Sequence, residues 1–514
     1  MISYKQCKTR CHQSEGKMDY MQQLFEPVYL IAAVIVVLSF LYIIKGKKYT
    51  NLPPGPKPWP IIGNIFDVKG KGALYEVALN LRQKYGDIVR LNLGPGNNIV
   101  LVIGQEKIFK AAVTMNESFK YRPTNFAATK YIFRNKGLLQ SNGDVHSSVR
   151  KFTLNALRDF GVGKRSIEGR VQEEAVILSE VLEKLDGKPA YHLDTFKMAV
   201  ANIIAGIVYG SRFEYNDPTF TDLIHKIDEI FKDLSVFLPE NFLPILRFLP
   251  GSKLSKVLAN VKSIEKYVKG RIEEHRETFD PDNIRDFVDL FLKNEGGSGD
   301  DAINEVNLFR LIVDLFNAGT DTTATTMTWA IIHLIKQPEV QKRCRDEILE
   351  VVGTGRSVSL DDKKDLPYLQ AFIDEVLRYS SIAPQTVPHS VIEDTEFEGY
   401  TIPKNSVVIF VLFTMLMDKD KWGDPDNFRP ERFLSEKGEY VQDKEHFAPF
   451  GLGGRSCVGK FLAKQELFIF LGTLIQRFEF KSPTGSPPPS TRRIQTGITS
   501  QPERYDICAI PLNH

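Results

Sequence analysis

The chain has 514 residues, of which 42% are hydrophobic and 25% charged, a globular composition that excludes a disordered or low-complexity protein. Its net charge of +2 gives no reason to expect a nucleic-acid partner, and its five cysteines are too few for a disulfide scaffold. Length alone allows about three domains, but no internal linker divides the chain after residue 60.

The N-terminal region is expected to anchor the protein in a membrane. Residues 1–26 are polar, and residues 27–44 form an apolar run without a charge, nearly long enough to span a bilayer as a helix. No site of small residues marks a cleavable signal peptide. Lys45, Lys47 and Lys48 follow and favour a cytosolic position for the rest of the chain. A buried globular helix is the alternative.

A proline-rich stretch separates this run from the main body. Prolines at the density of residues 52–60 stiffen a chain into an extended spacer. Residues 45–60 are therefore predicted to be a basic, proline-rich hinge, and residues 61–514 to form one large domain.

The first part of that domain has mainly helical periodicity. Residues 87–93 and 98–104 are the exception, because they alternate as two paired strands do. A helix is expected to begin at Gly143, placing His146 and Arg150 one turn apart on one face. A solvated polar face would have the same spacing.

The middle of the domain contains an aromatic, proline-broken segment and a long helix. Residues 237–251 cannot form a regular helix, and are expected to be buried or to contact the membrane surface. Residues 303–336 read as an apolar helix through the core, interrupted by the polar motif at residues 318–323. Thr322 could bond the Ala318 carbonyl and open the helix for a small ligand, with Asp321 and Thr322 relaying protons. A close helix contact through small residues is the alternative.

The last part combines short elements with a cysteine-containing loop. A helix over residues 369–379 sets Glu375 and Arg378 three positions apart, and strands are expected at 396–403 and 406–411. In residues 450–459, the Cys loop, glycines surround Cys457 just before a helix over residues 460–478. A helix N-terminus favours thiolate over thiol, so Cys457 is a candidate haem-iron ligand. A buried structural cysteine is the alternative.

Together and in this order, these motifs resemble the cytochrome P-450 superfamily, from about residue 50 to the end. The Cys loop has every fixed position of the haem-loop signature, and residues 318–323 match the oxygen-activation motif. Glu375 and Arg378, with Arg432, match a buried network of the family. The sequence around His389 and at residues 422–433 resembles the family-2 clan of microsomal members. One departure is His146, where the family usually has tryptophan.

The resemblance implies a mainly α fold with small β-sheets (α+β), with haem b between the central helix and the Cys-loop helix. It implies that Cys457 is the axial ligand of the iron and that Asp321 and Thr322 protonate activated oxygen. The remaining implied haem-pocket residues are the cations Arg455, Arg150, His389, Arg122 and His146 at the propionates, Phe450, Gly451 and Gly459 near the sulfur, and Ala318 and Gly319 beside oxygen.

The implied reaction is insertion of one atom of dioxygen into a lipophilic small molecule. NADPH–cytochrome P-450 reductase would supply electrons, with cytochrome b5 as a second candidate donor, at the cytosolic face of the endoplasmic reticulum membrane. Four segments are expected to face substrate: residues 124–133, 237–251, 382–387 and 497–499. A peroxide isomerase or dehydratase on the same fold, and a non-catalytic haem-binding sensor or carrier, are the alternatives.

Overall fold

The computed structural model describes residues 49–59, 62–94, 97–126, 128–161, 165–233, 239–242, 244–249, 251–295, 302–442, 446–496 and 499–512. The predicted anchor at residues 27–44 and the polar segment before it lie outside these ranges, as does part of the hinge. Among the helices in these ranges, none is both long and apolar enough to cross a membrane.

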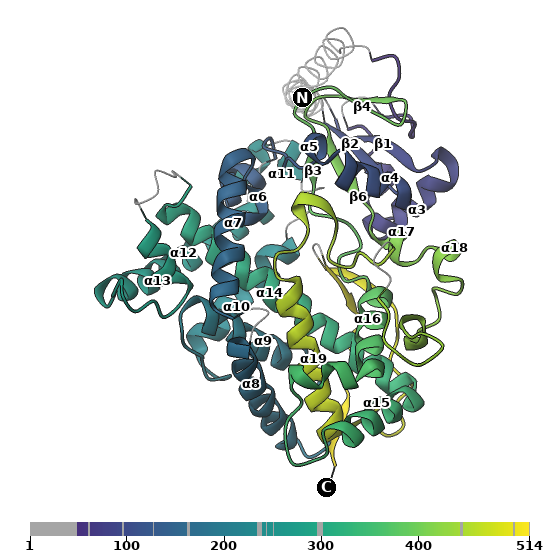
Figure 1. The fold of residues 1–514 in the computed structure, drawn as a ribbon. Helices are drawn as coiled ribbons and strands as arrows, with labels where there is room; N and C mark the ends of the chain where they lie inside the picture. The colour runs from purple at the N-terminus through teal and green to yellow at the C-terminus, as the bar shows by residue number, and fades with distance from the viewer. Residues whose placement is uncertain are drawn as a thin grey trace, which may run out of the picture.

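Helices make up most of the described chain (Figure 1). The longer ones are α3 (Leu74–Tyr85), α7 (Gly143–Asp159), α8 (Arg165–Glu183), α9 (Leu193–Val208), α10 (Pro218–Asp233), α12 (Lys253–Glu277), α13 (Phe287–Asn294), α14 (Glu305–Lys336), α15 (Pro338–Val351), α16 (Pro367–Ser380) and α19 (Lys460–Arg477). Short α-helices are α2 (Ile65–Val68), α4 (Gln105–Phe109), α5 (Asn116–Phe119), α6 (Gly137–Gln140), α11 (Pro239–Phe242), α17 (Phe413–Leu416) and α18 (Lys419–Trp422). Short 3-10 and π segments are η1 (Lys110–Thr114), η2 (Ala128–Phe133), η3 (Pro244–Phe248), η4 (Leu360–Asp365), η5 (Pro430–Phe433) and η6 (Gly453–Arg455).

The strands form one four-stranded sheet and three two-stranded ones within the described ranges. The large sheet has the order β1 (Ile88–Asn92), β2 (Asn98–Val102), β6 (Val407–Phe410), β3 (His389–Ser390). The pairs are β4 (Thr395–Phe397) with β5 (Tyr400–Ile402), β7 (Phe478–Lys481) with β10 (Cys508–Pro511), and β8 (Arg493–Thr496) with β9 (Thr499–Pro502). This confirms the predicted mainly α architecture with small sheets.

Most predicted elements agree with the structure, and the differences are local. The predicted strand pair corresponds to β1 and β2, which are antiparallel, whereas β2 pairs with β6 in parallel. The helix predicted to end at residue 478 ends at Arg477, because Phe478 begins β7. In the segment predicted to lack a regular helix, Pro239 and Pro244 each begin a short helical turn, a position where the missing proline N–H costs nothing.

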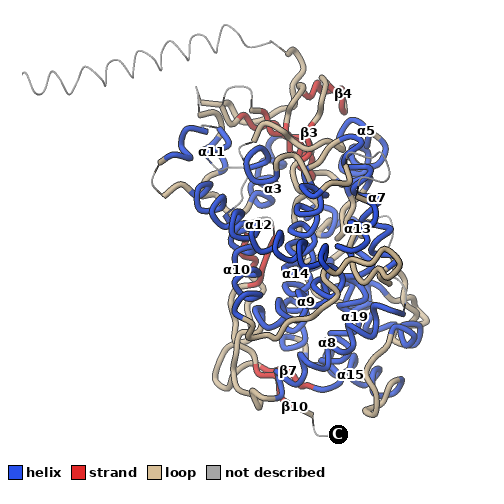
Figure 2. Tube along the Cα trace, turned by 90° about the vertical axis from the view of Figure 1, so that its left-hand side faces the viewer, coloured by secondary structure: helices blue, strands red, loops and turns tan. Residues whose placement is uncertain are grey.

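The long helix α14 runs through the centre of the molecule, where α9 and α19 lie beside it (Figures 1 and 2). Asn304 caps its start by accepting a hydrogen bond from the Asn307 backbone N–H. A Cβ on Gly319 would stand 2.6 Å from the Ile204 side chain of α9. The glycine therefore lets the two helices approach closely, as the helix-contact alternative proposed.

A buried charge network ties α16 to the segment before α19. Glu375 and Arg378 are both fully buried and form a two-bond pair, with N–O distances of 2.7 Å. Arg432 Nε lies 3.4 Å from Glu375, and the Arg429 backbone N–H donates to the same carboxylate at 2.8 Å. The structure confirms the predicted association of Glu375, Arg378 and Arg432.

Candidate active site

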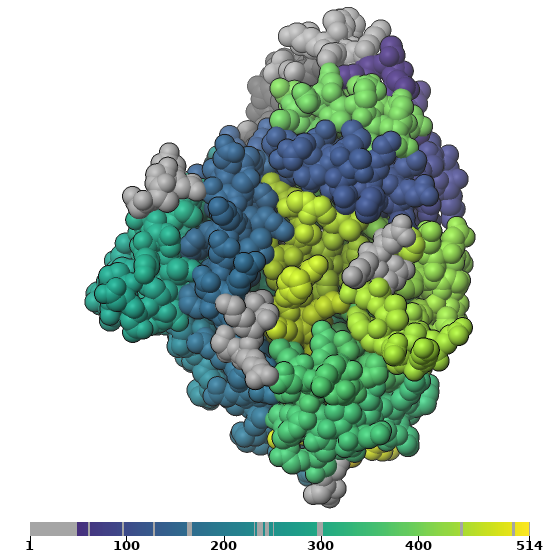
Figure 3. All heavy atoms as spheres, in the orientation of Figure 1, coloured from purple at the N-terminus to yellow at the C-terminus, as the bar shows by residue number. Residues whose placement is uncertain are grey.

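A cavity lies between α14 and the Cys loop. The part of α14 that carries the motif at residues 318–323 lines one wall. The opposite wall is lined by Phe450, Gly451, Arg455 and Cys457. Figure 3 shows the Cys-loop end of the chain and the start of α19, in yellow-green, at the surface between the blue segment containing α7 and the green segment containing α15 and α16. The Cys loop, which lines the cavity, thus also reaches this face of the molecule.

The backbone of the Cys loop brings Cys457 to the cavity. The Cys457 N–H donates to the Phe450 carbonyl at 2.9 Å, closing the loop, and α19 begins three residues later. Gly453 has a φ of +69°, and a Cβ there would stand 1.9 Å from the Ala112 carbonyl oxygen. Only glycine allows both this conformation and this close approach to η1.

The Gly459 N–H and the nearby cations favour the Cys457 thiolate, as expected, but burial acts in the opposite direction. Burial raises the pKa of the Cys457 thiol, and this outweighs the opposing effects of the Gly459 N–H, Arg150 and Lys460. The helix N-terminus is thus insufficient by itself. A metal cation at the sulfur would reverse the balance, because a coordinating thiol loses its proton.

Arginines and histidines cluster at one edge of the same cavity. Arg122, Arg150, Arg455, His146 and His389 all line it. Burial, together with the nearby arginines, lowers the pKa of Arg455 to about 10 and the pKa of His146 to about 3. Burial also lowers the pKa of His389 well below its usual value. At neutral pH the edge therefore presents charged arginines and neutral imidazoles.

The hydrogen bonds of these side chains leave one arginine nitrogen without a partner. The His389 Nδ1–H donates to the Phe119 carbonyl at 2.7 Å, so Nε2 of the neutral ring is an acceptor and becomes a donor only when the ring is protonated. Arg455 donates to the Lys120 and Ser141 carbonyls at 2.8 and 2.7 Å, while its Nη1 is buried without a partner. Within the described part of the chain, no carboxylate forms an ion pair with Arg122, Arg150 or Arg455. The edge is built to receive an anion.

On the opposite wall, Thr322 and Asp321 have different surroundings. Thr322 lines the cavity, and its hydroxyl donates to the Ala318 carbonyl at 2.6 Å, as predicted. Asp321 is absent from the cavity lining; its carboxylate accepts hydrogen bonds from Thr499 at 2.9 Å and Gln501 at 3.1 Å. The motif thus places its hydroxyl, and not its carboxylate, at the cavity.

Comparisons with known proteins identify the family. The sequence profile of the family described as cytochrome P-450 matches residues 53–509. The chain is 38% identical over 494 residues to cytochrome P-450 2J1 of Oryctolagus cuniculus, covering 94% of this chain and 96% of the relative. It is 36% identical to cytochrome P-450 2B2 of Rattus norvegicus (94% and 99% covered) and to cytochrome P-450 2C8 of Homo sapiens (93% and 99%). The chain belongs to the cytochrome P-450 family.

This cytochrome P-450 is a monooxygenase, an oxidoreductase whose cofactor is haem b. The family number 2 of the relatives also confirms the predicted likeness to the family-2 clan. The residues of the cavity fit a haem, since a free cysteine faces one wall and the buried Nη1 of Arg455 lacks a partner. Two propionate groups would provide the negative charge that the cation cluster lacks.

The structure brings together nearly all the residues predicted for the site of this cytochrome P-450. Besides Thr322, the lining contains Cys457, Arg455, Arg150, His389, Arg122, His146, Phe450, Gly451, Gly459, Ala318 and Gly319. Asp321 is the exception, because it is not among the described residues that line the cavity. His146, which stands where tryptophan was expected, keeps a place at the cationic edge.

The substrate-facing segments were predicted less well. Residues of 382–387 and Thr499 line the cavity, but no described residue of 124–133 or 237–251 does. Sequence reasoning missed an apolar wall on α9, formed by Ile204, Ile207 and Val208, and Leu315 on α14. The spacing of the three α9 residues was a detectable signal, because they occupy one helix face.

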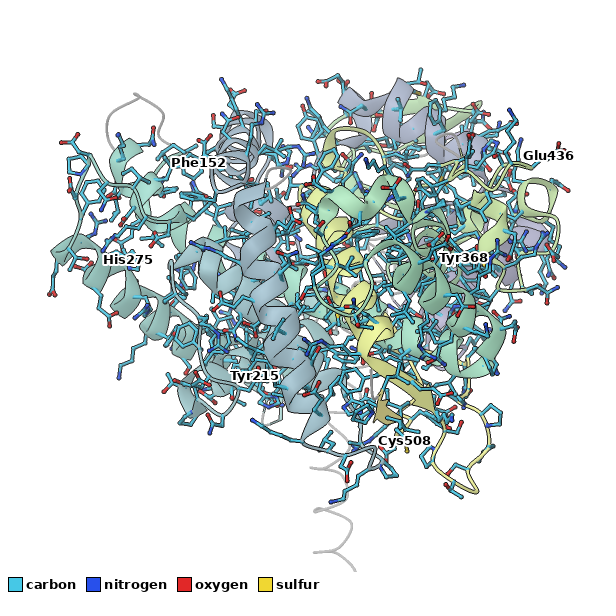
Figure 4. All side chains as sticks on the ribbon, turned by 60° about the horizontal axis from the view of Figure 1, so that its bottom comes forward. Phe152, Tyr215, His275, Tyr368, Glu436 and Cys508 are labelled. Atoms are coloured by element: carbon cyan, nitrogen blue, oxygen red, sulfur yellow. The ribbon has the colours of Figure 1, made fainter. Side chains whose placement is uncertain are left out.

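A second cluster of titratable groups lies outside this site. His275, Asp286 and Asp289 are close enough to hold a metal, but their atoms are already used. His275 bonds Asp286 and the Arg271 carbonyl, each at 2.8 Å, while Arg285 pairs with Asp289 at 2.6 Å. Figure 4 shows His275 and Phe152 on the same lobe, on the other side of α19 from Tyr368. The cluster caps α13 and is structural.

Proposed function

We propose that this chain inserts one atom of dioxygen into a lipophilic small molecule, with electrons from NADPH supplied through cytochrome P-450 reductase. The observation that carries the proposal is one cavity with the Cys457 thiol and the Thr322 hydroxyl on facing walls and aliphatic side chains between them. Such a lining suits a steroid, an isoprenoid, a fatty acid or an apolar xenobiotic.

The roles of the cavity residues follow from their chemistry. When bound between α14 and α19, haem would supply the redox centre that activates dioxygen, and a thiolate ligand favours cleavage of the O–O bond. Cys457 would ligate the iron, and the Gly459 N–H would tune the sulfur. Arg455, Arg150 and His389, with Arg122 and His146, would hold the propionates. Thr322 and Asp321 would deliver protons toward the oxygen.

We assign the protein to the cytosolic face of the endoplasmic reticulum membrane, held by an anchor at residues 27–44 and the hinge at 45–60. Phe248 and Leu249, 73% and 57% exposed, would add contact with the lipid surface. Flotation with membranes, compared between the full chain and a chain lacking residues 1–44, tests the anchor. Equal flotation of the two chains would contradict the assignment of residues 27–44 as the anchor.

The reductase is expected to dock on the face over the Cys loop, and cytochrome b5 would compete there. Arg150, Lys151 and Lys460 supply positive charge, and the exposed Phe461 adds an apolar contact. Reversing Lys151 and Lys460 to glutamate should slow reductase-dependent reduction but leave chemical reduction by dithionite unchanged. Equal slowing of both would exclude a docking role.

The test of the proposed function begins with the ligand. Cys457→Ala is expected to abolish the red-shifted absorption of the reduced carbon monoxide complex, because only a thiolate ligand produces it. Cys344→Ala, which alters a buried cysteine elsewhere, is the matched control and should keep the band. An unchanged band in Cys457→Ala would contradict the assignment.

Turnover then separates the proposal from its alternatives. The full chain with reductase and NADPH should consume dioxygen and oxygenate members of a lipid panel. Rearrangement of organic peroxides without reductase would favour an isomerase or dehydratase. Absence of turnover across the panel, with a normal carbon monoxide spectrum, would favour a haem-binding sensor or carrier.

A further inference from the structure

The carboxylate of the α14 motif is held by a lysine that lies outside the motif. Lys197, on α9, places its Nζ 2.9 Å from Asp321 Oδ1. Thr499 and Gln501 of β9 donate to the same carboxylate. Asp321 is therefore fixed between α9 and β9, on the outer side of the wall whose inner side presents Thr322.

Lys197 is a buried cation with two anionic partners. Its side chain is only 6% exposed, and its Nζ also lies 2.9 Å from Asp228 Oδ1 on α10. Burial by itself lowers the pKa of Lys197, but the carboxylates of Asp321 and Asp228 raise it above its usual value. A buried ammonium group is tolerated only when it is paired in this way, so Lys197 stays charged and bridges the two aspartates.

The bridge ends at a small cavity between α9 and α10. Lys197 and Asp228 line it together with Asp194, Tyr215 and His225. Asp228 also pairs with Lys232, whose side chain is 46% exposed and so reaches solvent. Two hydrogen-bond contacts of 2.9 Å thus connect the solvent side of α10 to the α14 motif.

Building on the proposed oxygenase function, we propose that Lys197 is a positioning residue that controls proton delivery by Asp321, and that Asp228 sets how firmly Lys197 holds Asp321. With the lysine in place, the Asp321 carboxylate is held at one position. Without it, only Thr499 and Gln501 would hold the carboxylate, which could then take other positions. Proton delivery would then be less efficient.

The test compares product formed per NADPH consumed, and peroxide released. Lys197→Met should lower the product yield by about tenfold, while Lys197→Arg should restore it. Asp222→Asn, which removes a surface pair with Lys226 on α10, is the control and should match the unaltered chain. Full yield in Lys197→Met would overturn the proposal.

A second measurement needs no turnover. Acylation of lysines in the haem-bound protein, followed by mass spectrometry, should modify Lys197 slowly relative to the exposed Lys342. Asp228→Asn and Asp321→Asn should each speed its modification, because each removes one of its partners. Unchanged slow labelling in both variants would overturn the proposal, even if Lys197→Met fails to fold. Loss of the proposed function would instead appear as inactivity of the unaltered chain, without any change in this labelling.

Discussion

Gly453 and Gly438 share a positive φ, but adding a Cβ at the two positions should cost different amounts of folding free energy. Both have positive φ, +69° and +80°. A Cβ on Gly453 would stand 1.9 Å from the Ala112 carbonyl oxygen, whereas a Cβ on Gly438 meets nothing within 4 Å. The Cys loop therefore depends on glycine for space as well as for conformation.

The comparison gives a prediction for the two alanine variants. Gly438→Ala should cost about 1–2 kcal/mol, the strain of a left-handed alanine. Gly453→Ala should cost clearly more and should also reduce the haem-bound fraction, since η1 must move away from the Cys loop. Thermal unfolding and the haem-to-protein absorbance ratio check both; equal losses would show that the close approach is unimportant.

Thr322 and Thr328 allow a second comparison at the level of single residues. Both hydroxyls bond the carbonyl four residues earlier on α14, at 2.6 and 3.0 Å. Thr322 lines the cavity, whereas Thr328 does not. Thr322→Ala should therefore divert NADPH consumption from product to peroxide, while Thr328→Ala should leave the ratio unchanged. If Thr322→Ala stays fully coupled, its hydroxyl has no part in proton delivery.

Among the elements, α16 is an example of one that depends on buried charge. Its Glu375 carboxylate accepts hydrogen bonds from Arg378 and from the Arg429 backbone, so it joins a helix to the irregular segment that leads to the Cys loop. Such a pair is costly to bury, and removing one partner leaves the other charge without compensation. Its contribution is to fix the relative position of the two elements.

Glu375→Gln should accordingly lower the free energy of unfolding by about 3–5 kcal/mol. The exposed pair of Lys342 and Asp346 on α15 is the matched control, and Asp346→Asn should cost about 0–1 kcal/mol. Chemical denaturation of both variants measures the difference. Similar midpoints would mean that the buried pair contributes no more than a surface pair.

For the whole molecule, acid stability should depend on buried neutral histidines. His333 is 3% exposed and stacks on Phe428 with a ring distance of 3.9 Å. Burial, with smaller effects of nearby cations, lowers its pKa to about 3. In the unfolded chain the pKa is about 6.5, so between these values the unfolded state binds more protons. The contribution of the neutral His333 to the free energy of unfolding is therefore fully present above pH 6.5 and is lost as the pH falls toward 3.

His333→Phe should remove this part of the acid sensitivity while keeping the stack. Between pH 6.5 and 5, the unaltered chain should lose about 1.5 kcal/mol more than the variant. Denaturant unfolding at the two pH values measures the difference. The same loss in both proteins would show that His333 is already protonated in the folded state.

The sequence predicted those features whose partners lie close together along the chain or whose chemistry is distinctive. Cys457 in its glycine loop, the Thr322 bond to Ala318 and the α16 pair are of this kind. The position of Asp321 was not predictable, because it depends on how α9 and β9 cross α14. The apolar face of α9 was detectable from its spacing, but its contact with the cavity was not, since Gly319 shows that a close crossing is tolerated but not which helix makes it.

The cationic edge of the cavity also constrains when the protein can mature. Arg455 donates to the carbonyl of Ser141, which precedes it by 314 residues, and the parallel pairing of β2 with β6 joins similarly distant segments. Closing such long loops is slow and requires both segments to be present. During synthesis, the N-terminal half must therefore wait for residues near 460 before the cavity exists. Cofactor capture is thus a late event, after most of the chain has left the ribosome.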